Sequence, residues 1–429
     1  MKNSSGKQYL STNYTPTFYT SYKLVKLVFS ALLKSIITKN RLFIPISILP
    51  KIFKIKKDLY LSKIIYFNNQ YFSTPTIPAF PSTAYNEMLK KGGLNFYDAG
   101  TNAKNQIDSV FLAITNTCKL KCEYCYERQN INRGEKINPE KWINTIKELQ
   151  NKGVNIFILS GGEPLSDFES LIKILETSDK SKSDFHLHTS GHDLNTEKVK
   201  MLKKAGLKAA AVGLDDCNQE SHDKIRGKGS FNNAVNALKL FNENGIFTYV
   251  NFCAGKNIIN EDRLFEYFHF VKSLHVSLIQ LLEPRPCGGY LGKSNIEWLN
   301  TKEKKALLEF TKTGNLNKKY KDYPLIYYVA HIEGKDKLGC LMGGLSHFYI
   351  DSKGNVCPCV FFPVSYGNIL NENITLILKR MRSSIPFPIH AECPSMLLKD
   401  KFQNLFVNEH SVPFDSRLIQ NCLDNIYKK

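Results

Sequence analysis

Hydrophobic and polar positions between residues 108 and 290 alternate with two different periods. Short apolar runs predict six β-strands, over Val110–Thr115, Asn155–Ser160, Phe185–His188, Ala209–Leu214, Phe247–Asn251 and Val276–Leu282. The stretches between them carry apolar residues at helical spacing and predict α-helices over residues 139–151, 167–177, 196–205, 231–244 and 261–274. This alternation is typical of βαβ units, so the pattern predicts an α/β fold with a parallel sheet, either open or a partial barrel. In both cases functional residues lie at the carboxyl ends of the strands.

The regions on either side of this core differ in composition. Residues 1–75 predict a flexible tail followed by a basic amphipathic arm, and the Pro-rich residues 76–107 predict a linker or lid. Residues 108–300 form the predicted core. Residues 301–429 contain a segment rich in Gly, Cys and Pro, which predicts a small Cys-containing module followed by a C-terminal tail.

The charge of the chain is concentrated in the arm. The net charge of +19 results from 58 Lys and Arg against 39 Asp and Glu, and residues 1–60 hold eleven of the basic side chains and one acidic one. A nucleic-acid-binding protein would spread this excess over a surface, so nucleic acid is the least favoured partner. Residues 24–37 place apolar side chains at helical spacing beside Lys26 and Lys34. The arm is therefore predicted to pack on the protein itself or to contact an anionic membrane surface through residues 23–57.

The cysteine content indicates the cellular compartment. Eleven cysteines in 429 residues are too few, and odd in number, for a disulfide scaffold, and the amino terminus lacks the pattern of a secretory signal. No stretch reaches the roughly 18 apolar residues that a membrane-spanning helix needs. We expect a cytoplasmic protein whose thiols serve metal chemistry, with attachment to the inner face of the membrane as the alternative that the arm allows.

Three of these thiols follow the first predicted strand directly. Cys118, Cys122 and Cys125 have the spacing C-x3-C-x2-C in one loop. Three thiolates from a short loop can hold three irons of a [4Fe–4S] cube and leave the fourth iron open. Structural zinc prefers four protein ligands in paired C-x2-C units, which this loop does not offer. The spacing therefore favours an iron–sulfur cluster over zinc.

This loop resembles the signature of the radical S-adenosylmethionine (SAM) superfamily, whose fold is a partial (β/α)6 barrel. Two later strand ends agree with the resemblance: Ser160–Pro164 matches the family's GGEP motif, and Thr189–Gly191 offers polar side chains where the family often contacts the ribose. Leu214–Asp216 and His222–Phe231 resemble the stretch after the fourth strand in the branch that modifies peptides. The resemblance covers roughly residues 108–290.

The resemblance implies cofactors and roles for particular residues. A [4Fe–4S] cluster on the three cysteines would receive an electron from a donor such as flavodoxin or ferredoxin. SAM would be cleaved to methionine and a 5′-deoxyadenosyl radical, which abstracts hydrogen from the substrate. Glu163 is implied as the partner of the SAM amino group, Arg226 of its carboxylate and Tyr124 of its adenine. The implied SAM-binding residues are Tyr124, Gly161, Gly162, Glu163, Thr189, Ser190 and Arg226.

A second group of cysteines resembles the start of the SPASM extension, which carries auxiliary iron–sulfur clusters. Cys340, Gly354 and Cys359 have the spacing C-x13-G-x4-C, and the residues between them predict a strand–turn–strand hairpin. The dense cysteine run that completes the extension is absent from this sequence, which favours a shortened, twitch-like module with one auxiliary [4Fe–4S] cluster. Its implied metal ligands are Cys340, Cys359 and Cys393, with Cys357 or Cys422 as the fourth. The alternative is that these residues are buried free thiols.

Three classes of function follow from these features. We expect a radical SAM enzyme, an oxidoreductase or peptide-modifying enzyme, that oxidises or crosslinks a peptide or protein side chain. The alternatives are a radical SAM enzyme acting on a lipid or lipid-linked small molecule, and a zinc- and nucleic-acid-binding protein without enzymatic activity. Glu283 and Arg285, after the sixth strand, are expected to face the substrate. Cys217 and Cys253 are expected to be buried thiols, whereas Cys287 stays open, and no catalytic residue is indicated beyond the cofactor ligands.

Overall fold

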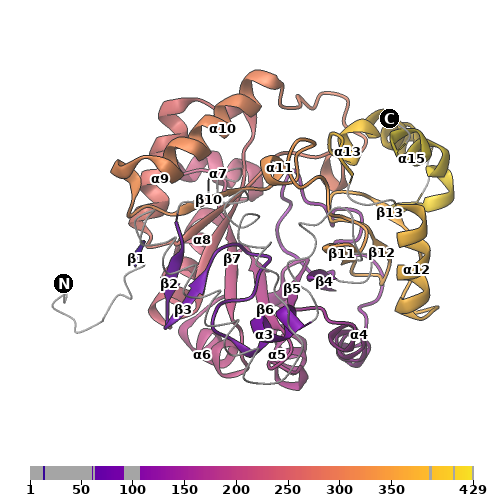
Figure 1. Ribbon diagram of the computed structural model, residues 1–429, viewed down its shortest axis with the longest axis horizontal. Helices are drawn as coiled ribbons and strands as arrows, with labels where there is room; N and C mark the ends of the chain where they lie inside the picture. The colour runs from indigo at the N-terminus through magenta and orange to yellow at the C-terminus, as the bar shows by residue number, and fades with distance from the viewer. Residues whose placement is uncertain are drawn as a thin grey trace.

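The computed structural model describes residues 13–14, 60, 63–90, 107–385, 389–408 and 411–427 (Figure 1). The basic arm of residues 23–57 lies outside the described residues. Its amphipathic helix and its contact with a membrane surface therefore stay predictions.

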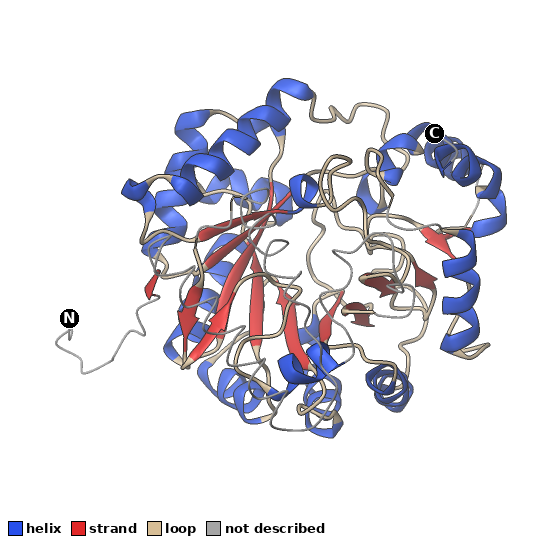
Figure 2. Ribbon diagram, in the orientation of Figure 1, coloured by secondary structure: helices blue, strands red, loops and turns tan. Residues whose placement is uncertain are grey.

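Seven parallel strands form the centre of the molecule (Figure 2). Six of them were predicted from the apolar runs, and their bounds are β4 (Ser109–Thr115), β5 (Ile156–Gly161), β6 (Asp184–Thr189), β7 (Ala209–Gly213), β8 (Phe247–Cys253) and β9 (Leu278–Leu282). The seventh, β10 (Leu325–Tyr328), pairs in parallel with β9 and was not predicted. Over the described residues the strands form an open row rather than a closed ring, which confirms the α/β partial-barrel fold.

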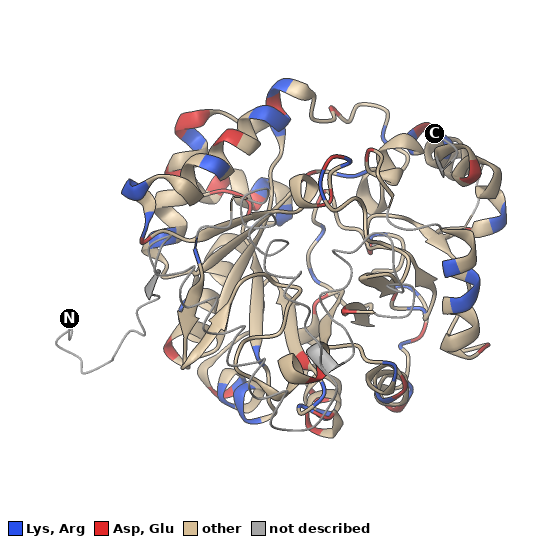
Figure 3. Cartoon of the chain, in the orientation of Figure 1, with Lys and Arg blue, Asp and Glu red and all other residues tan. Residues whose placement is uncertain are grey.

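Helices cover the outer face of this sheet. Five of them match the predicted ranges: α4 (Pro139–Asn151), α5 (Phe168–Thr177), α6 (Thr196–Lys204), α8 (Ser230–Glu243) and α9 (Glu261–Ser273). Asparagine side chains cap several of these helices; for example, Asn138 accepts from the Glu140 N–H, and Pro139 at the first helical position needs no such partner. Lys, Arg, Asp and Glu gather on the outer helices, whereas the strands are nearly free of them (Figure 3). This distribution places the core between the helices and the sheet.

The C-terminal segment extends the same sheet. The predicted hairpin is present as β11 (His347–Ile350) and β12 (Val356–Cys357), which pair in antiparallel register with Tyr349 opposite Cys357. Strand β11 also pairs in parallel with β4, so the order of the nine-stranded sheet is β10-β9-β8-β7-β6-β5-β4-β11-β12. The remaining elements of this segment are α12 (Ile374–Ser384), β13 (Val364–Ser365), α13 (Pro394–Leu397), α14 (Lys399–Val407), β14 (Phe414–Asp415) and α15 (Gln420–Tyr427). The hairpin that carries Cys357 is thus attached directly to the core sheet.

An N-terminal hairpin packs on the inner face of the sheet. Strand β2 (Ile65–Phe67) pairs with β3 (Gln70–Phe72) and with the short β1 (Asn13–Tyr14). The ring of Phe72 stacks on Phe247 of β8 with centroids 3.9 Å apart. Beyond the hairpin, Ala79 is fully buried and its N–H donates to Asp184 at 3.3 Å, before α3 (Thr83–Lys90) begins. Residues 76–80, in the range predicted as a linker, are therefore packed against the sheet because apolar side chains there complete its inner core.

A buried lysine fixes this N-terminal segment. The Nζ of Lys63 donates to the carbonyl oxygens of Gly314, Tyr320 and Tyr323 at 2.8, 2.6 and 3.2 Å. Gly314 lies near the end of α10 (Thr301–Leu316), where carbonyl groups lack helical partners. Burial lowers the pKa of Lys63 to about 7, with a further contribution from Lys272.

Candidate active site

A cavity lies at the carboxyl ends of the parallel strands. It is lined by residues that follow β4 and by the ends of β5, β6, β7, β8 and β9, as well as by residues of the C-terminal segment. The predicted site residues that line it are Cys118, Cys122, Tyr124, Cys125, Gly161, Gly162, Glu163, Thr189, Ser190, Arg226 and Cys359. Cys340, Cys357 and Cys393 are not among its lining residues.

The three-cysteine loop is held by close backbone contacts. The N–H groups of Gly162 and Glu163 donate to the carbonyls of Thr115 and Thr117, both at 2.7 Å. A Cβ on Gly162 would lie 2.3 Å from the Thr117 oxygen, so glycine is required there. From the sequence, these glycines were expected to let a ligand approach the backbone closely. In the structure they let the start of the three-cysteine loop approach it.

The loop is clamped from the opposite side by the segment after β9. The N–H of Gly289 donates to the carbonyl of Cys125 at 2.8 Å. A Cβ on Gly288 would lie 2.1 Å from the same carbonyl oxygen, and Gly288 has a φ of +50°. Because both sides of the loop meet backbone, the positions of the three cysteines are set by the fold rather than by a ligand.

The donor set of the loop fits an iron–sulfur cluster. All three thiols are free and line one cavity. They are close enough to interact, because Cys122 and Cys118 both raise the pKa of Cys125, after the larger effect of burial. Burial also raises the pKa of Cys118 to about 11. Among the described residues, no three His, Cys, Asp or Glu side chains gather closely enough for a single metal ion. A cube of four irons holds its thiolates at separate corners, further apart than the ligands of one ion.

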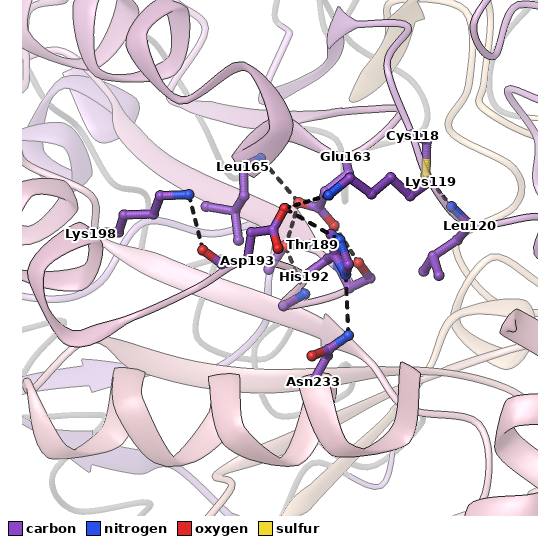
Figure 4. A network of polar contacts seen from close by, with 12 residues as sticks. Cys118, Lys119, Leu120, Glu163, Leu165, Thr189, His192, Asp193, Lys198 and Asn233 are labelled. Carbon is purple, nitrogen blue, oxygen red and sulfur yellow. Dashed lines mark hydrogen bonds and ion pairs between the residues drawn. The ribbon is translucent and has the colours of Figure 1, made fainter. Parts of the chain in front are cut away.

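Glu163 joins the ends of two neighbouring strands (Figure 4). Its side chain is 2 % exposed, and Oε1 accepts from the Leu165 N–H at 3.1 Å and the Thr189 hydroxyl at 2.6 Å. The other oxygen, Oε2, accepts from the N–H of Ser190 at 2.7 Å and from its hydroxyl. All four usual acceptor positions of the carboxylate are therefore used by protein donors. The structure gives Glu163 a role in fixing the cavity wall besides the ligand contact that the resemblance implies.

Arg226 and Tyr124 share a buried carboxylate. Asp215 accepts hydrogen bonds from the Arg226 Nε at 2.5 Å, from the Tyr124 hydroxyl and, through its other oxygen, from the Cys253 N–H at 3.1 Å. Burial opposes the charge of Asp215, but Arg226 holds its pKa below the ordinary value. The Arg226 guanidinium lies directly over Gly213, where a Cβ would approach it to 2.2 Å. These contacts fix the orientation of both side chains at the cavity.

The stretch His222–Phe231 explains how this arginine is positioned. Asp223 of α7 (Gln219–Arg226), a helix that was not predicted, accepts from the N–H groups of Gly229 and Phe231 at 2.7 and 2.8 Å. It thereby binds the first turn of α8. The buried His222 accepts from the Asp215 N–H at 3.1 Å. The motif therefore acts largely as a scaffold that presents Arg226 to the cavity.

Two residues expected to face the substrate bind each other instead. Arg285 donates to Glu283 at 2.8 Å, and Glu283 also accepts from the Tyr328 hydroxyl. Neither side chain is among those lining the cavity. The expectation for Glu283 and Arg285 is therefore wrong, because the chain turns after β9 and buries both side chains against the C-terminal segment.

Sequence reasoning missed several residues at the deep end of the cavity. Asn251 of β8, Gln280 of β9 and Tyr327 of β10 lie side by side in register and all line it. The side-chain oxygens of Asn251 and Gln280 are buried without a hydrogen-bond partner. His188 also lines the cavity, and burial lowers its pKa to about 3. The alternation along these strands shows which side chains share one face of the sheet, but it does not show which face encloses a cavity.

The site indicates the class of protein. The strand ends of the α/β sheet surround three thiols of one loop, together with a buried carboxylate and an arginine that is ion-paired. Such a site is that of a partial-barrel enzyme with an iron–sulfur centre. Comparison of the sequence with known families agrees, because residues 112–271 match the radical SAM superfamily. Residues 340–394 match SPASM, an iron–sulfur cluster-binding domain. The chain contains a radical SAM domain and a SPASM domain, whose cofactors are a [4Fe–4S] cluster, SAM and auxiliary iron–sulfur clusters.

Similar proteins differ in what they act on. The chain is 25 % identical over 286 residues to a GTP 3′,8-cyclase of Aliarcobacter butzleri, covering 62 % of this chain and 85 % of the cyclase. It is 28 % identical over 141 residues to the sporulation killing factor maturation protein SkfB of Bacillus subtilis, covering 32 % of this chain and 33 % of SkfB. Streptococcus suis SuiB bound to its precursor peptide SuiA has the same fold, with a TM-score of 0.55 at 14 % identity over 83 % of this chain and 87 % of SuiB. Among the described residues, no helix is long and apolar enough to cross a membrane.

Proposed function

We propose that this chain is a radical SAM enzyme that modifies a side chain of a peptide or protein. The observation that carries the proposal is the continuity of the cavity, which runs from the three-cysteine loop to Cys359 of the cluster-binding segment. A substrate in this cavity lies between both cysteine groups. When bound, the cluster and SAM supply the radical that abstracts hydrogen from a substrate carbon.

The proposed contacts to SAM use the residues that line the loop end of the cavity. The negative charge of Glu163 and the backbone at Gly161 and Gly162 attract its amino group, and Arg226 takes its carboxylate. Arg226 is oriented for this by Asp215 and Tyr124, which accept from its Nε and Nη2 and leave its Nη1 without a hydrogen-bond partner among the described residues. Because these side chains are fixed before ligand arrives, little ordering is needed on binding.

The chemistry of the deep end favours an amide over a phosphorylated substrate. Among the described residues that line the cavity, Arg226 is the one Lys or Arg, and it is ion-paired with Asp215. A triphosphate is normally bound by several cationic groups. The unpartnered oxygens of Asn251 and Gln280 can instead accept from substrate N–H groups. Glu333 in the same lining adds no positive charge for an anionic substrate, and burial raises its pKa to about 7.

The test compares the two substrate classes directly. Anaerobically prepared protein is incubated with SAM, a reductant and either GTP or synthetic peptides encoded by short reading frames beside its gene. We expect a peptide to lose two hydrogen atoms, as oxidation and crosslink formation both require, while GTP is unchanged. Conversion of GTP with every peptide unchanged would overturn the proposal.

A second candidate, action on a lipid-linked substrate, is favoured by the charge of the arm. Eleven basic side chains and one acidic one in residues 1–60 would attract an anionic surface, at about 1 kcal/mol for each cation near it. Such binding weakens as salt shortens the screening length. The full-length protein is then expected to sediment with anionic but not neutral vesicles at low salt. Absence of binding to anionic vesicles would remove the membrane surface as a partner.

A further inference from the structure

We propose that Cys287 is the fourth thiol ligand of the auxiliary cluster, together with Cys340, Cys359 and Cys393, and that Cys357 is not a ligand. The sequence left the fourth position to Cys357 or Cys422. The inference rests on the cluster-binding domain that the chain contains and is independent of the substrate.

Backbone contacts bring Cys340, Cys359 and Cys393 into one region. Cys340 exchanges two hydrogen bonds with Ile389, at 2.9 and 3.2 Å, four positions before Cys393. The N–H of Gly343 donates to the carbonyl of Pro358 at 2.9 Å, which ties the Cys340 segment to the residue before Cys359. These contacts make the three thiols neighbours, and Cys393 and Cys359 are both close enough to interact electrostatically with Cys340.

Cys287 approaches this group from the core. It is 3 % exposed and lines a small cavity together with Cys359. Cys287 is also close enough to the Cys393 and Cys359 thiols to interact with both electrostatically. Its backbone is fixed, because the following glycines are held against the carbonyl of Cys125.

A buried ion pair lies beside Cys393. The Arg285 side chain is 10 % exposed, donates to Glu283 at 2.8 Å and is close enough to the Cys393 thiol to interact with it electrostatically. A cluster with four thiolate ligands carries net negative charge, and its properties depend on neighbouring charge and hydrogen bonds. The pair of Arg285 and Glu283 therefore borders the proposed cluster site at Cys393 rather than the substrate.

Cys357 has different neighbours. It lies on β12 opposite Tyr349 and packs with Tyr349 and Ala113 in a buried apolar cluster of the sheet. Cys357 shares the small cavity with Cys287 and Cys359, so it is close enough to serve as a matched control. Cys422 packs against the apolar core from α15.

The experiment isolates the auxiliary cluster. The full-length protein with Cys118, Cys122 and Cys125 all changed to Ala is purified anaerobically, and Cys287→Ala or Cys357→Ala is added to it. Iron content and the electron paramagnetic resonance spectrum of the reduced protein are measured without SAM or peptide. We expect about four irons per chain in the parent and in the Cys357 variant, with identical spectra. The Cys287→Ala variant is expected to lose most of its iron or to show a changed spectrum.

A conservative variant separates ligation from folding. Serine can offer an oxygen ligand of nearly the same size, so Cys287→Ser is expected to retain more iron than Cys287→Ala but with a shifted spectrum. Cys357→Ser is expected to leave the spectrum unchanged. Iron and spectrum unaffected in Cys287→Ala, or equal loss in the Cys287 and Cys357 variants, would overturn the proposal. No substrate is present, so failure here leaves the proposed peptide activity to its own test.

Discussion

Replacing Glu163 by Gln tests how the cavity wall is held. The substitution keeps the shape of the side chain but converts one carboxylate oxygen into an NH2 group. At either oxygen, that group meets one backbone N–H, from Leu165 or Ser190, and one hydroxyl, from Thr189 or Ser190. The hydroxyl can turn and accept, whereas the backbone N–H loses its acceptor in a buried site.

The magnitude follows from these contacts. One buried N–H without a partner costs about 1–3 kcal/mol, and the hydrogen bonds that remain lose the strengthening due to the charge. We therefore expect Glu163→Gln to lower the free energy of unfolding by about 2–4 kcal/mol in anaerobic urea denaturation. We also expect SAM affinity, measured by calorimetry, to fall at least tenfold because the carboxylate charge is lost.

The matched control is Glu123→Gln. Glu123 belongs to the three-cysteine loop, but its side chain is 48 % exposed and lies 3.7 Å from Lys293. Such an exposed pair contributes under about 1 kcal/mol, so this variant should resemble the wild type. If Glu163→Gln unfolds and binds SAM like Glu123→Gln, the role assigned to the buried carboxylate is refuted.

Further predictions concern the pH dependence, the N-terminal segment and the metal content. Burial raises the pKa of Asp108 to about 7, above its unfolded value, so its contribution to stability is present below about pH 4 and is lost as the pH rises through 7. Asp108→Asn should therefore reduce the loss of stability between pH 5 and 8, by about 2–3 kcal/mol, in unfolding experiments at both pH values; an unchanged slope contradicts this. Lys63→Met should lower the free energy of unfolding by about 2–4 kcal/mol, because three carbonyls lose their donor. A chain beginning at Gln70 should aggregate, since it lacks both Lys63 and β2. A truncated protein that is stable in gel filtration would show that the segment is dispensable. Changing Cys118, Cys122 and Cys125 together to Ala should leave about half of the iron, and unchanged iron would place the cluster elsewhere.

The sequence predicted the core because its signals are local. The apolar runs and helix caps of residues 108–290 are set by neighbours in the chain, and the predicted and observed strands differ by at most two residues at either end. Strand β10 was missed since LIYY is short and is positioned by tertiary contacts, through pairing with β9 and through two hydrogen bonds between Ile326 and Asn315. The hairpin at residues 65–72 was missed for the same reason, because its burial depends on Phe247, far along the chain.

For the candidate site, residue types could be predicted better than contacts. The spacing of Cys118, Cys122 and Cys125 indicated their chemistry, and the structure places them in one cavity. The pairing of Arg285 with Glu283 could not be predicted, since nothing in the sequence shows which way the chain turns after β9. The scaffold role of the glycines at 161 and 162 likewise depends on a tertiary contact with residues 115–117.

The most direct test of the central claim measures 5′-deoxyadenosine. Anaerobically prepared protein is incubated with SAM and a chemical reductant, and the nucleoside is quantified by mass spectrometry beside the variant with Cys118, Cys122 and Cys125 changed to Ala. We predict that the iron-containing wild type forms 5′-deoxyadenosine and methionine and that the variant forms neither. Equal amounts from both proteins, or none from wild type that holds its iron, would contradict the account.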